Sequence, residues 1–222
     1  FGRAITEAEK TENKGALNLV RWRKGEQKNV VVAVKAIGAY SPTAPFNCPK
    51  TAKIIESECA YLLKHGFGED VQGNVNALAA LATGRPEFSS MLEKHARNVG
   101  PKDLKLSLES GGMTAWEWGY AALFLTEYYL ATTNADLLPA IREYAVTIAK
   151  GQSNVGSWGH GMAWTGLNEG RLHGSLSGYG SLNQAGLICF MSLALAKECG
   201  VNDPEIDAAI AQATKFYGFY IN

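Results

Sequence analysis

A glycine-rich segment between two helical stretches gathers most of the side chains in this chain that could carry chemistry. It contains His160, Arg171, His173 and Tyr179, and Asn183 follows directly after it. Histidine exchanges protons near neutral pH, tyrosine can act as an acid or a base, and arginine and asparagine can neutralise a carboxylate. The segment therefore predicts a proton-transfer site, with His160, Tyr179, His173 and Arg171 as the catalytic candidates.

The glycine content of this segment supports a functional interpretation. Ten glycines occur between residues 151 and 186, and long connectors in compact domains are usually functional or mobile. His160 is the first choice for the proton-transfer residue because Gly159 and Gly161 leave its backbone free to adapt to a ligand. The alternative is a structural loop in which the histidines and the arginine donate hydrogen bonds to backbone carbonyls.

Aromatic and amide side chains supply the candidates for substrate binding. Asn183 and Trp164 belong to or border the same connector, and Trp118 lies on a long apolar segment. Trp116 and Trp118 diverge by about 200° if that segment is helical, so that one of them can line a cavity and stack on a flat ligand. The alternative is that both rings belong to the core.

Four further titratable residues are weaker candidates. Glu117 and Glu127 lie within the apolar segment, where a carboxylate needs a polar partner or becomes protonated, and we treat them as secondary acids. His65 and His95 lie near expected helix ends, and we expect both to be surface residues favoured by the helix dipole.

The stretch QSNVGSW, Gln152 to Trp158, favours a structural role. A glutamine amide can cap the end of a neighbouring helix, and a tryptophan ring can fill the space between two helical hairpins. We therefore expect these two side chains to stabilise the junction between consecutive hairpins.

The elements that must position these residues are mostly helices. Apolar periodicity and terminal Pro, Gly, Asn and Asp signals predict helical segments within residues 49–66, 70–84, 85–100, 114–133, 134–150, 181–200 and 203–222. Segments that are apolar on nearly every face alternate with amphipathic ones. Two layers of helices produce this pattern, because inner helices are surrounded by neighbours and outer helices show one face to water.

The first 38 residues have a different pattern. GRAITEAEK predicts a short helix, and the stretch from Ala16 to Gly38 predicts two strands around the turn RKGEQK. Three prolines within residues 42–49 then make an extended connector. This predicts a domain boundary within residues 39–48.

Composition restricts the class of protein. The 222 residues are 46% hydrophobic and carry no net charge, which argues against nucleic-acid binding, and no segment is long and apolar enough to span a membrane. The four cysteines form no CxxC pair and are expected to be buried thiols, although a disulfide between Cys48 and Cys59 stays open for a secreted protein.

QSNVGSW resembles the Q-x-x-x-G-x-W pattern of squalene and oxidosqualene cyclases, and residues 49–222 resemble the α/α-toroid of terpenoid cyclases and protein prenyltransferases. The segments GAYSPTAPFNCPK, GSWGHG and GYGSLNQAG are more closely similar to an uncharacterised bacterial family, in which a PDZ-like domain precedes such a toroid. The resemblance implies a mainly α fold. Its expected parts are an αββ remnant of a PDZ-like domain (1–38), a Pro-rich linker (39–48) and an incomplete toroid-like array of helical hairpins (49–222) that ends before the domain does.

The resemblance implies no chemistry by itself. The chain lacks the D-x-D-D and D-D-x-x-D motifs of the cyclases, so terpene cyclisation and prenyl transfer are disfavoured. Asparagine, histidine, tyrosine and arginine are also the residue types with which toroidal polysaccharide lyases abstract a proton beside a uronate carboxylate.

Two hypotheses for the function follow. The first is an extracytoplasmic enzyme that acts on a polysaccharide or similar polymer at the glycine-rich mouth of the array, without a cofactor or metal. The second is a non-catalytic binding or scaffold module that recruits a polysaccharide or a protein chain end. The remaining parts of a longer chain are a further expected partner in either case.

Overall fold

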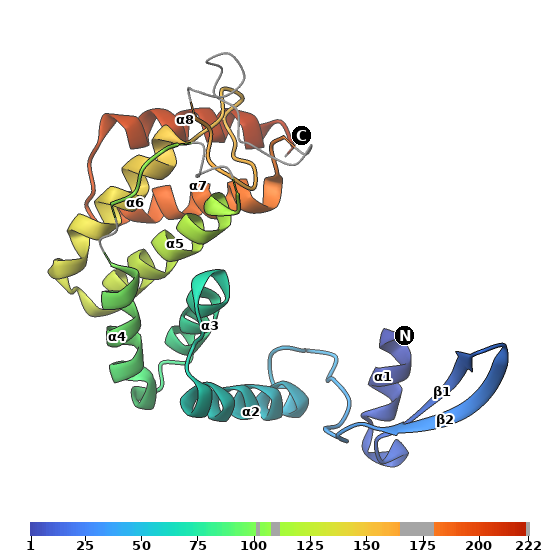
Figure 1. The fold of residues 1–222 in the computed structure, drawn as a ribbon. Coiled ribbons are helices and arrows are strands. Elements are labelled where there is room, and N and C mark those ends of the chain that lie inside the picture. Colours follow the sequence, from blue (N-terminus) through green and yellow to red (C-terminus); the bar gives the residue numbers. More distant parts are fainter. Residues whose placement is uncertain (101–102, 108–111, 165–179, 221–222) are drawn as a thin grey trace. The chain divides into compact units, whose positions relative to one another are not determined.

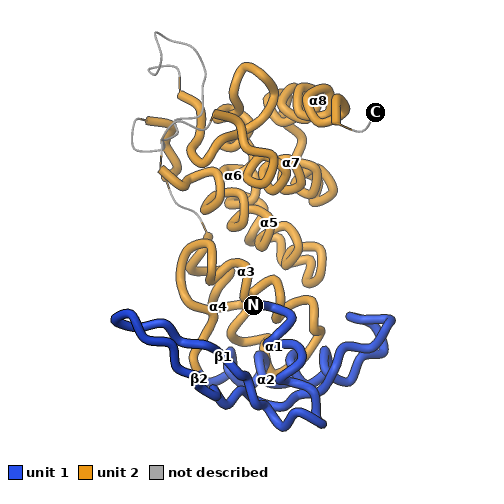
Figure 2. Tube along the Cα trace, turned by 90° about the vertical axis from the view of Figure 1, so that its right-hand side faces the viewer, with its two compact units in different colours: residues 1–64 blue, residues 65–222 orange. Residues whose placement is uncertain are grey.

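The computed structural model of the chain describes residues 1–100, 103–107, 112–164 and 180–220 (Figure 1). Its contacts divide the chain into two compact units, residues 1–64 and residues 65–222 (Figure 2). The sequence places the domain boundary within residues 39–48, and that position stays a prediction.

The first unit starts with the predicted helix and strand pair. Helix α1 (Gly2–Ala8) precedes β1 (Ala16–Arg23) and β2 (Glu26–Ala33), which pair antiparallel from Ala16 opposite Ala33 to Arg23 opposite Glu26. Lys24 and Gly25 form the two-residue turn, both with positive φ (53° and 84°), as a tight hairpin requires. The αββ pattern expected from the sequence is confirmed.

A buried lysine ties the start of the long helix α2 (Pro49–His65) to the residues before it. The Lys50 side chain is 2% exposed and forms an ion pair with Glu9, the residue that ends α1. The Lys50 ammonium also lies 4.2 Å from the centre of the Tyr40 ring, within the range of a cation–π interaction. These contacts hold α1, the proline-rich connector and α2 in one unit.

The described part of the second unit contains six α-helices, and five of them form two rows. The odd-numbered helices contact one another in the order α3–α5–α7. Helices α6 and α8 contact each other and form the second row, whereas α4 contacts α3 and α5. Each of the later pairs, α5 with α6 and α7 with α8, is a helical hairpin (Figure 1). The helices are α3 (Asp70–Ala82), α4 (Ser89–Val99), α5 (Thr114–Thr132), α6 (Leu138–Lys150), α7 (Asn183–Glu198) and α8 (Pro204–Gly218).

Burial follows the predicted alternation for α5 and α6. Helix α5 has buried residues in every turn from Ala115 to Tyr128, whereas α6 buries one face, which includes Ile141 and Ile148. Helix α7 departs from the expectation, because Leu187 and Met191 are 42% and 49% exposed. The helix is apolar on several faces, but one of them is not covered within the described residues.

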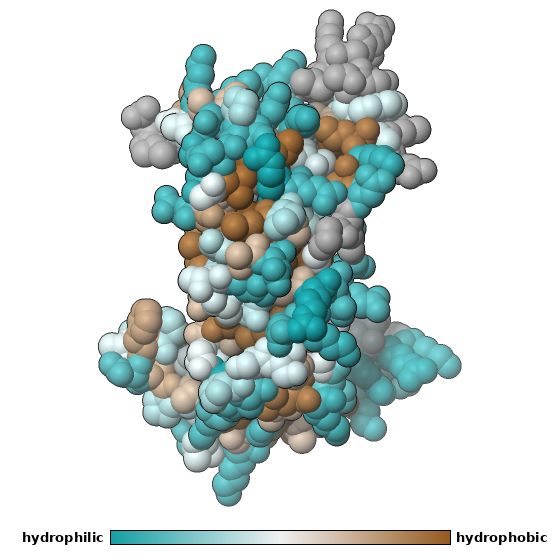
Figure 3. Space-filling model, turned by 90° about the vertical axis from the view of Figure 1, so that its left-hand side faces the viewer, coloured by the Kyte–Doolittle hydropathy of each residue, from teal (hydrophilic) through white to brown (hydrophobic). Residues whose placement is uncertain are grey.

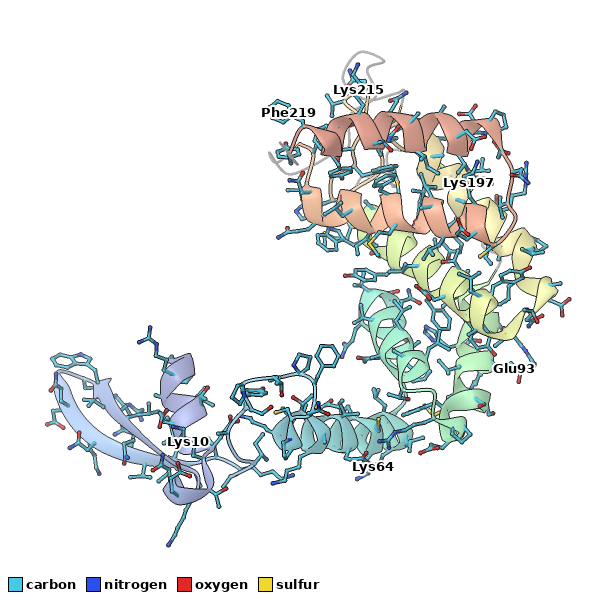
Figure 4. The ribbon with its side chains drawn as sticks, turned by 180° about the vertical axis from the view of Figure 1, so that it is seen from behind. Lys10, Lys64, Glu93, Lys197, Lys215 and Phe219 are labelled. Atoms are coloured by element: carbon cyan, nitrogen blue, oxygen red, sulfur yellow. The ribbon has the colours of Figure 1, made fainter. Side chains whose placement is uncertain are left out.

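The mainly α fold with a small antiparallel strand pair is therefore as predicted. None of the described helices combines the length and the hydropathy needed to cross a bilayer. Figure 3 shows that apolar residues reach one face of the molecule in several patches separated by hydrophilic residues. Polar side chains also connect the helices, as in the ion pair between Lys197 of α7 and Asp207 of α8 (Figure 4).

Candidate functional site

The QSNVGSW segment has the structural role expected of it. Trp158 is fully buried, and its indole nitrogen donates a hydrogen bond of 2.8 Å to the carbonyl of Ile148 in the last turn of α6. The Gln152 amide donates to the carbonyls of Gly156 (3.2 Å) and Ala209 (2.9 Å). Ala209 lies within α8 and not at its end, so the expected cap is formed by Trp158 on α6, while Gln152 ties the segment to the middle of α8.

Close packing explains Gly156 of this segment and Gly186 of α7, which lies against it. A Cβ atom at Gly156 would lie 2.6 Å from the carbonyl oxygen of Gln212, and the residue has a φ of +93°. A Cβ at Gly186 would lie 2.0 Å from the Tyr217 hydroxyl, which is hydrogen-bonded to Ser157 at 2.9 Å. These glycines allow α7 and the connector to pack closely against α8, and they need no ligand to explain them.

His160 is held at the start of α5. Its Nδ1 accepts a hydrogen bond of 2.9 Å from the indole of Trp116, and its carbonyl accepts one from the backbone of Ala115. The ring is partly buried and accepts this hydrogen bond from a residue of α5, which gives it a structural partner. The grouping of His160 with Tyr179 stays a prediction, because the latter is outside the described residues.

Of the other predicted site residues, the structure describes Asn183, Trp164 and Trp118. Arg171 and His173 lie outside the described residues. Asn183 is the exposed first residue of α7, and Trp164 is half-buried. Trp118 lines a cavity, whereas Trp116 points to His160, so the two rings diverge as expected from their spacing.

The cavity at Trp118 lies among α3, α4, α5 and α6 and has a volume of about 100 Å³. We call it the His95 cavity. Its walls combine two carboxylates, an imidazole, an amide, two aromatic rings with polar atoms, and two aliphatic side chains. The lining residues are Asp70, Asn74, His95, Val99, Glu117, Trp118, Ala121 and Tyr144.

His95 is fixed in this cavity by a polar and an aromatic contact. Its Nε2 lies 3.0 Å from Oδ1 of the buried Asn74, and its ring packs edge-on against Phe67 and Phe124, with centroids 5.5 and 5.0 Å away. His95 is therefore half-buried against two rings and an amide, and not the exposed residue expected from the sequence. Gly73 lies beside the ring: a Cβ there would lie 3.3 Å from the imidazole and only 2.6 Å from the carbonyl oxygen of Gly68, which is the stronger constraint.

Burial determines the protonation states of His95 and Tyr144, two of the residues that line the cavity. It lowers the pKa of His95 below its ordinary value of 6.5, so the imidazole is neutral at pH 7. Because Oδ1 of Asn74 is an acceptor, the neutral ring donates from Nε2 and leaves Nδ1 as a free base. Burial, and second the charge of Glu143, raise the pKa of Tyr144 to about 12, so its hydroxyl stays protonated and donates to the Val99 carbonyl (3.2 Å).

The two carboxylates stand without cationic partners. Among the described residues, neither Asp70 nor Glu117 takes part in an ion pair. Glu117 was a secondary acid candidate in the sequence, and it lies in the His95 cavity beside Trp118. The arrangement of a neutral base, two carboxylates and an indole suits proton transfer on a bound polar group.

The described cysteines differ in their pKa values: hydrogen bonds from Thr51 and Ser41 lower the pKa of Cys48 to about 6, whereas burial raises that of Cys199. The Cys199 pKa of about 11 keeps that thiol protonated. All four cysteines are buried and free of disulfides, as expected. Among the described residues, no group of three His, Cys, Asp or Glu side chains has the arrangement of a metal site.

Comparison with known proteins gives one result. Neither the curated proteins nor the solved structures contain a match to the chain. A family model described as "Domain of unknown function (DUF6288)" matches residues 51–222, which include α3 to α8 and every residue of the His95 cavity. The chain therefore belongs to the DUF6288 family.

Proposed function

We propose that this chain is part of an enzyme that acts by acid–base catalysis on a polymer such as a polysaccharide, with the His95 cavity as its active site. The observation that carries the proposal is a neutral imidazole, oriented by Asn74, in a cavity that also holds Asp70 and Glu117. A general base must be unprotonated and held in a fixed orientation. Burial keeps His95 unprotonated, and the contact with Asn74 fixes the orientation of its ring.

The fold gives this proposal its context. We further propose that the two rows of helices belong to an α/α-toroid of the kind expected from the sequence, in which the α3–α5–α7 row is the inner one. Contacts along the row and the hairpin order support this arrangement. In such an array Asp70, Asn74, Glu117 and Trp118 come from the inner row, while His95 and Tyr144 reach the cavity from the outer helices.

The test separates the His95 cavity from the glycine-rich mouth predicted from the sequence. Neutral, acidic and amino polysaccharides are incubated with the protein, and new reducing ends and unsaturated products are measured. His95→Gln should lower the turnover of any substrate found by about 10²–10⁴-fold, the usual contribution of a general acid or base. His65→Gln is the matched control, because His65 is exposed and outside the cavity.

His160→Gln provides the competing outcome. Loss of turnover in this variant, with full turnover in His95→Gln, would move the active site to the glycine-rich connector. Full turnover in both variants would leave neither histidine as the base.

A binding or scaffold role is the second candidate, and the strand pair favours it. Val20, Trp22 and Val31 occupy one face of the pair and are 65–67% exposed. Exposed apolar side chains gathered on one face of a sheet are typical of a contact surface for another protein chain. Deletion of residues 1–38 should then remove binding while leaving turnover, if any, unchanged.

A further inference from the structure

We propose that the His95 cavity selects a positively charged amino group, and that the polymer on which the site acts is therefore rich in amino sugars. This inference rests on the proposed function and adds the charge of the substrate to it. It follows from the charges, the hydrogen-bonding capacity, the aromatic walls and the size of the cavity.

The charges of the cavity are all of one sign. Asp70 and Glu117 are the charged residues among those that line it, and no lysine or arginine is in that described lining. His95 adds no positive charge at pH 7, because burial holds its pKa below the ordinary value. A ligand therefore meets two negative charges without a compensating cation, and an anionic group would be repelled.

This charge balance changes the substrate class suggested by the sequence. The residue types of the glycine-rich connector resemble those with which lyases act beside a uronate carboxylate. A uronate in the His95 cavity would face two carboxylates and no cation among the described lining residues. An ammonium group in the same place would be attracted to both of them.

The hydrogen-bonding capacity of the cavity also favours an ammonium group. Carboxylates at neutral pH only accept hydrogen bonds, and Nδ1 of His95 is an acceptor when Nε2 donates to Asn74. The Tyr144 hydroxyl uses its proton on the Val99 carbonyl. The cavity thus has more acceptors than donors, and an ammonium group supplies three donors.

The aromatic walls favour a cation, and the volume of the cavity limits the size of the ligand group that can enter it. The faces of tryptophan and tyrosine attract cations, and Trp118 and Tyr144 both line the cavity. A volume of about 100 Å³ is smaller than the cavity of about 150 Å³ that holds one benzene molecule in another protein. That space suits one charged substituent of a sugar and not a complete ring, so the rest of the polymer would lie outside the cavity.

The test uses two oligomers that differ in this one group. A glucosamine tetramer and an N-acetylglucosamine tetramer are titrated into the wild-type chain by isothermal titration calorimetry at pH 6, where the free amine is largely protonated. We expect the glucosamine tetramer to bind at least tenfold more tightly. Equal affinities, tighter binding of the acetylated tetramer, or no binding of the amine at millimolar concentration would each overturn the proposal.

Two matched variants locate the effect. Glu117→Gln removes one charge of the cavity at constant shape and should weaken binding of the glucosamine tetramer on the order of tenfold or more, as for a charge-assisted hydrogen bond. Glu205→Gln changes an exposed glutamate in the first turn of α8 and should leave the affinity unchanged. Equal losses in both variants would mean a non-specific charge effect and would also overturn the proposal.

The outcomes distinguish this inference from the proposed function. Preference for the acetylated tetramer, together with loss of turnover in His95→Gln, would refute the amine and keep the active site. Retained turnover in His95→Gln, together with tight amine binding that depends on Glu117, would refute the base and keep the amine site.

Discussion

Replacement of Trp158 by alanine tests how the helical unit is held together. The ring is fully buried, and its indole nitrogen donates to the Ile148 carbonyl at 2.8 Å. Truncation of a buried tryptophan costs about 3–5 kcal/mol in the free energy of unfolding. For a unit of this size, each kcal/mol shifts the melting temperature by about 2–4 °C, so we expect a decrease of roughly 6–20 °C.

Two further variants divide this cost. Trp158→Phe keeps most of the ring but leaves the Ile148 carbonyl without the indole donor, so about 1–3 kcal/mol should remain. Phe219→Ala removes an aromatic ring that is 79% exposed at the end of α8 (Figure 4) and should change the stability little. Thermal unfolding followed by circular dichroism measures all three. A melting temperature of Trp158→Ala within error of the wild type would refute the structural role of QSNVGSW.

Three other variants have expected outcomes. Gly186→Ala should destabilise the helical unit by about 1–3 kcal/mol in a urea titration, because its Cβ would lie 2.0 Å from a buried hydroxyl. Gly218→Ala is the control: it has open space around it and should be neutral or slightly stabilising. Glu9→Ala should destabilise the first unit by up to about 3 kcal/mol in urea unfolding, since it leaves the buried Lys50 without its carboxylate partner. Glu7→Ala breaks the exposed pair with Lys10 and should lower the stability by less than about 1 kcal/mol. His95 has a folded pKa below its unfolded value, so its contribution to stability is complete above pH 6.5 and is lost as the pH falls from 6.5 to the folded pKa. The urea midpoint should therefore fall more over this range in the wild type than in His95→Gln. Parallel pH profiles of the two proteins would contradict the burial of the ring.

Local signals in the sequence were sufficient for much of the fold. Pro49 and Pro204 begin their helices as predicted, and Asp203 caps the second of them by accepting from the backbone of Glu205. The turn at Lys24 and Gly25 is likewise visible in the sequence, because few residue pairs adopt its backbone angles. Such features depend on residues close together in the chain, so they can be predicted without the tertiary structure.

The candidate site was harder to predict because its residues come from several helices. Asn74 and His95 are 21 residues apart, and Glu117 and Trp118 lie on a third helix. A single histidine on an amphipathic helix gives no sign that a distant amide and two rings will surround it. Only the high apolar content of α5 with Glu117 inside it indicated that a polar network was needed there.

The most direct test of the His95 cavity is an NMR titration of the wild-type chain with ¹⁵N-labelled histidine and tryptophan. The glucosamine tetramer is added, and the imidazole and indole signals are followed, with assignments from His95→Gln, His160→Gln, Trp116→Phe and Trp118→Phe. We predict that the signals of His95 and Trp118 move while those of His160 and Trp116 stay in place. Movement of His160 and Trp116 with unchanged His95 and Trp118 signals would contradict the assignment of the active site to the His95 cavity.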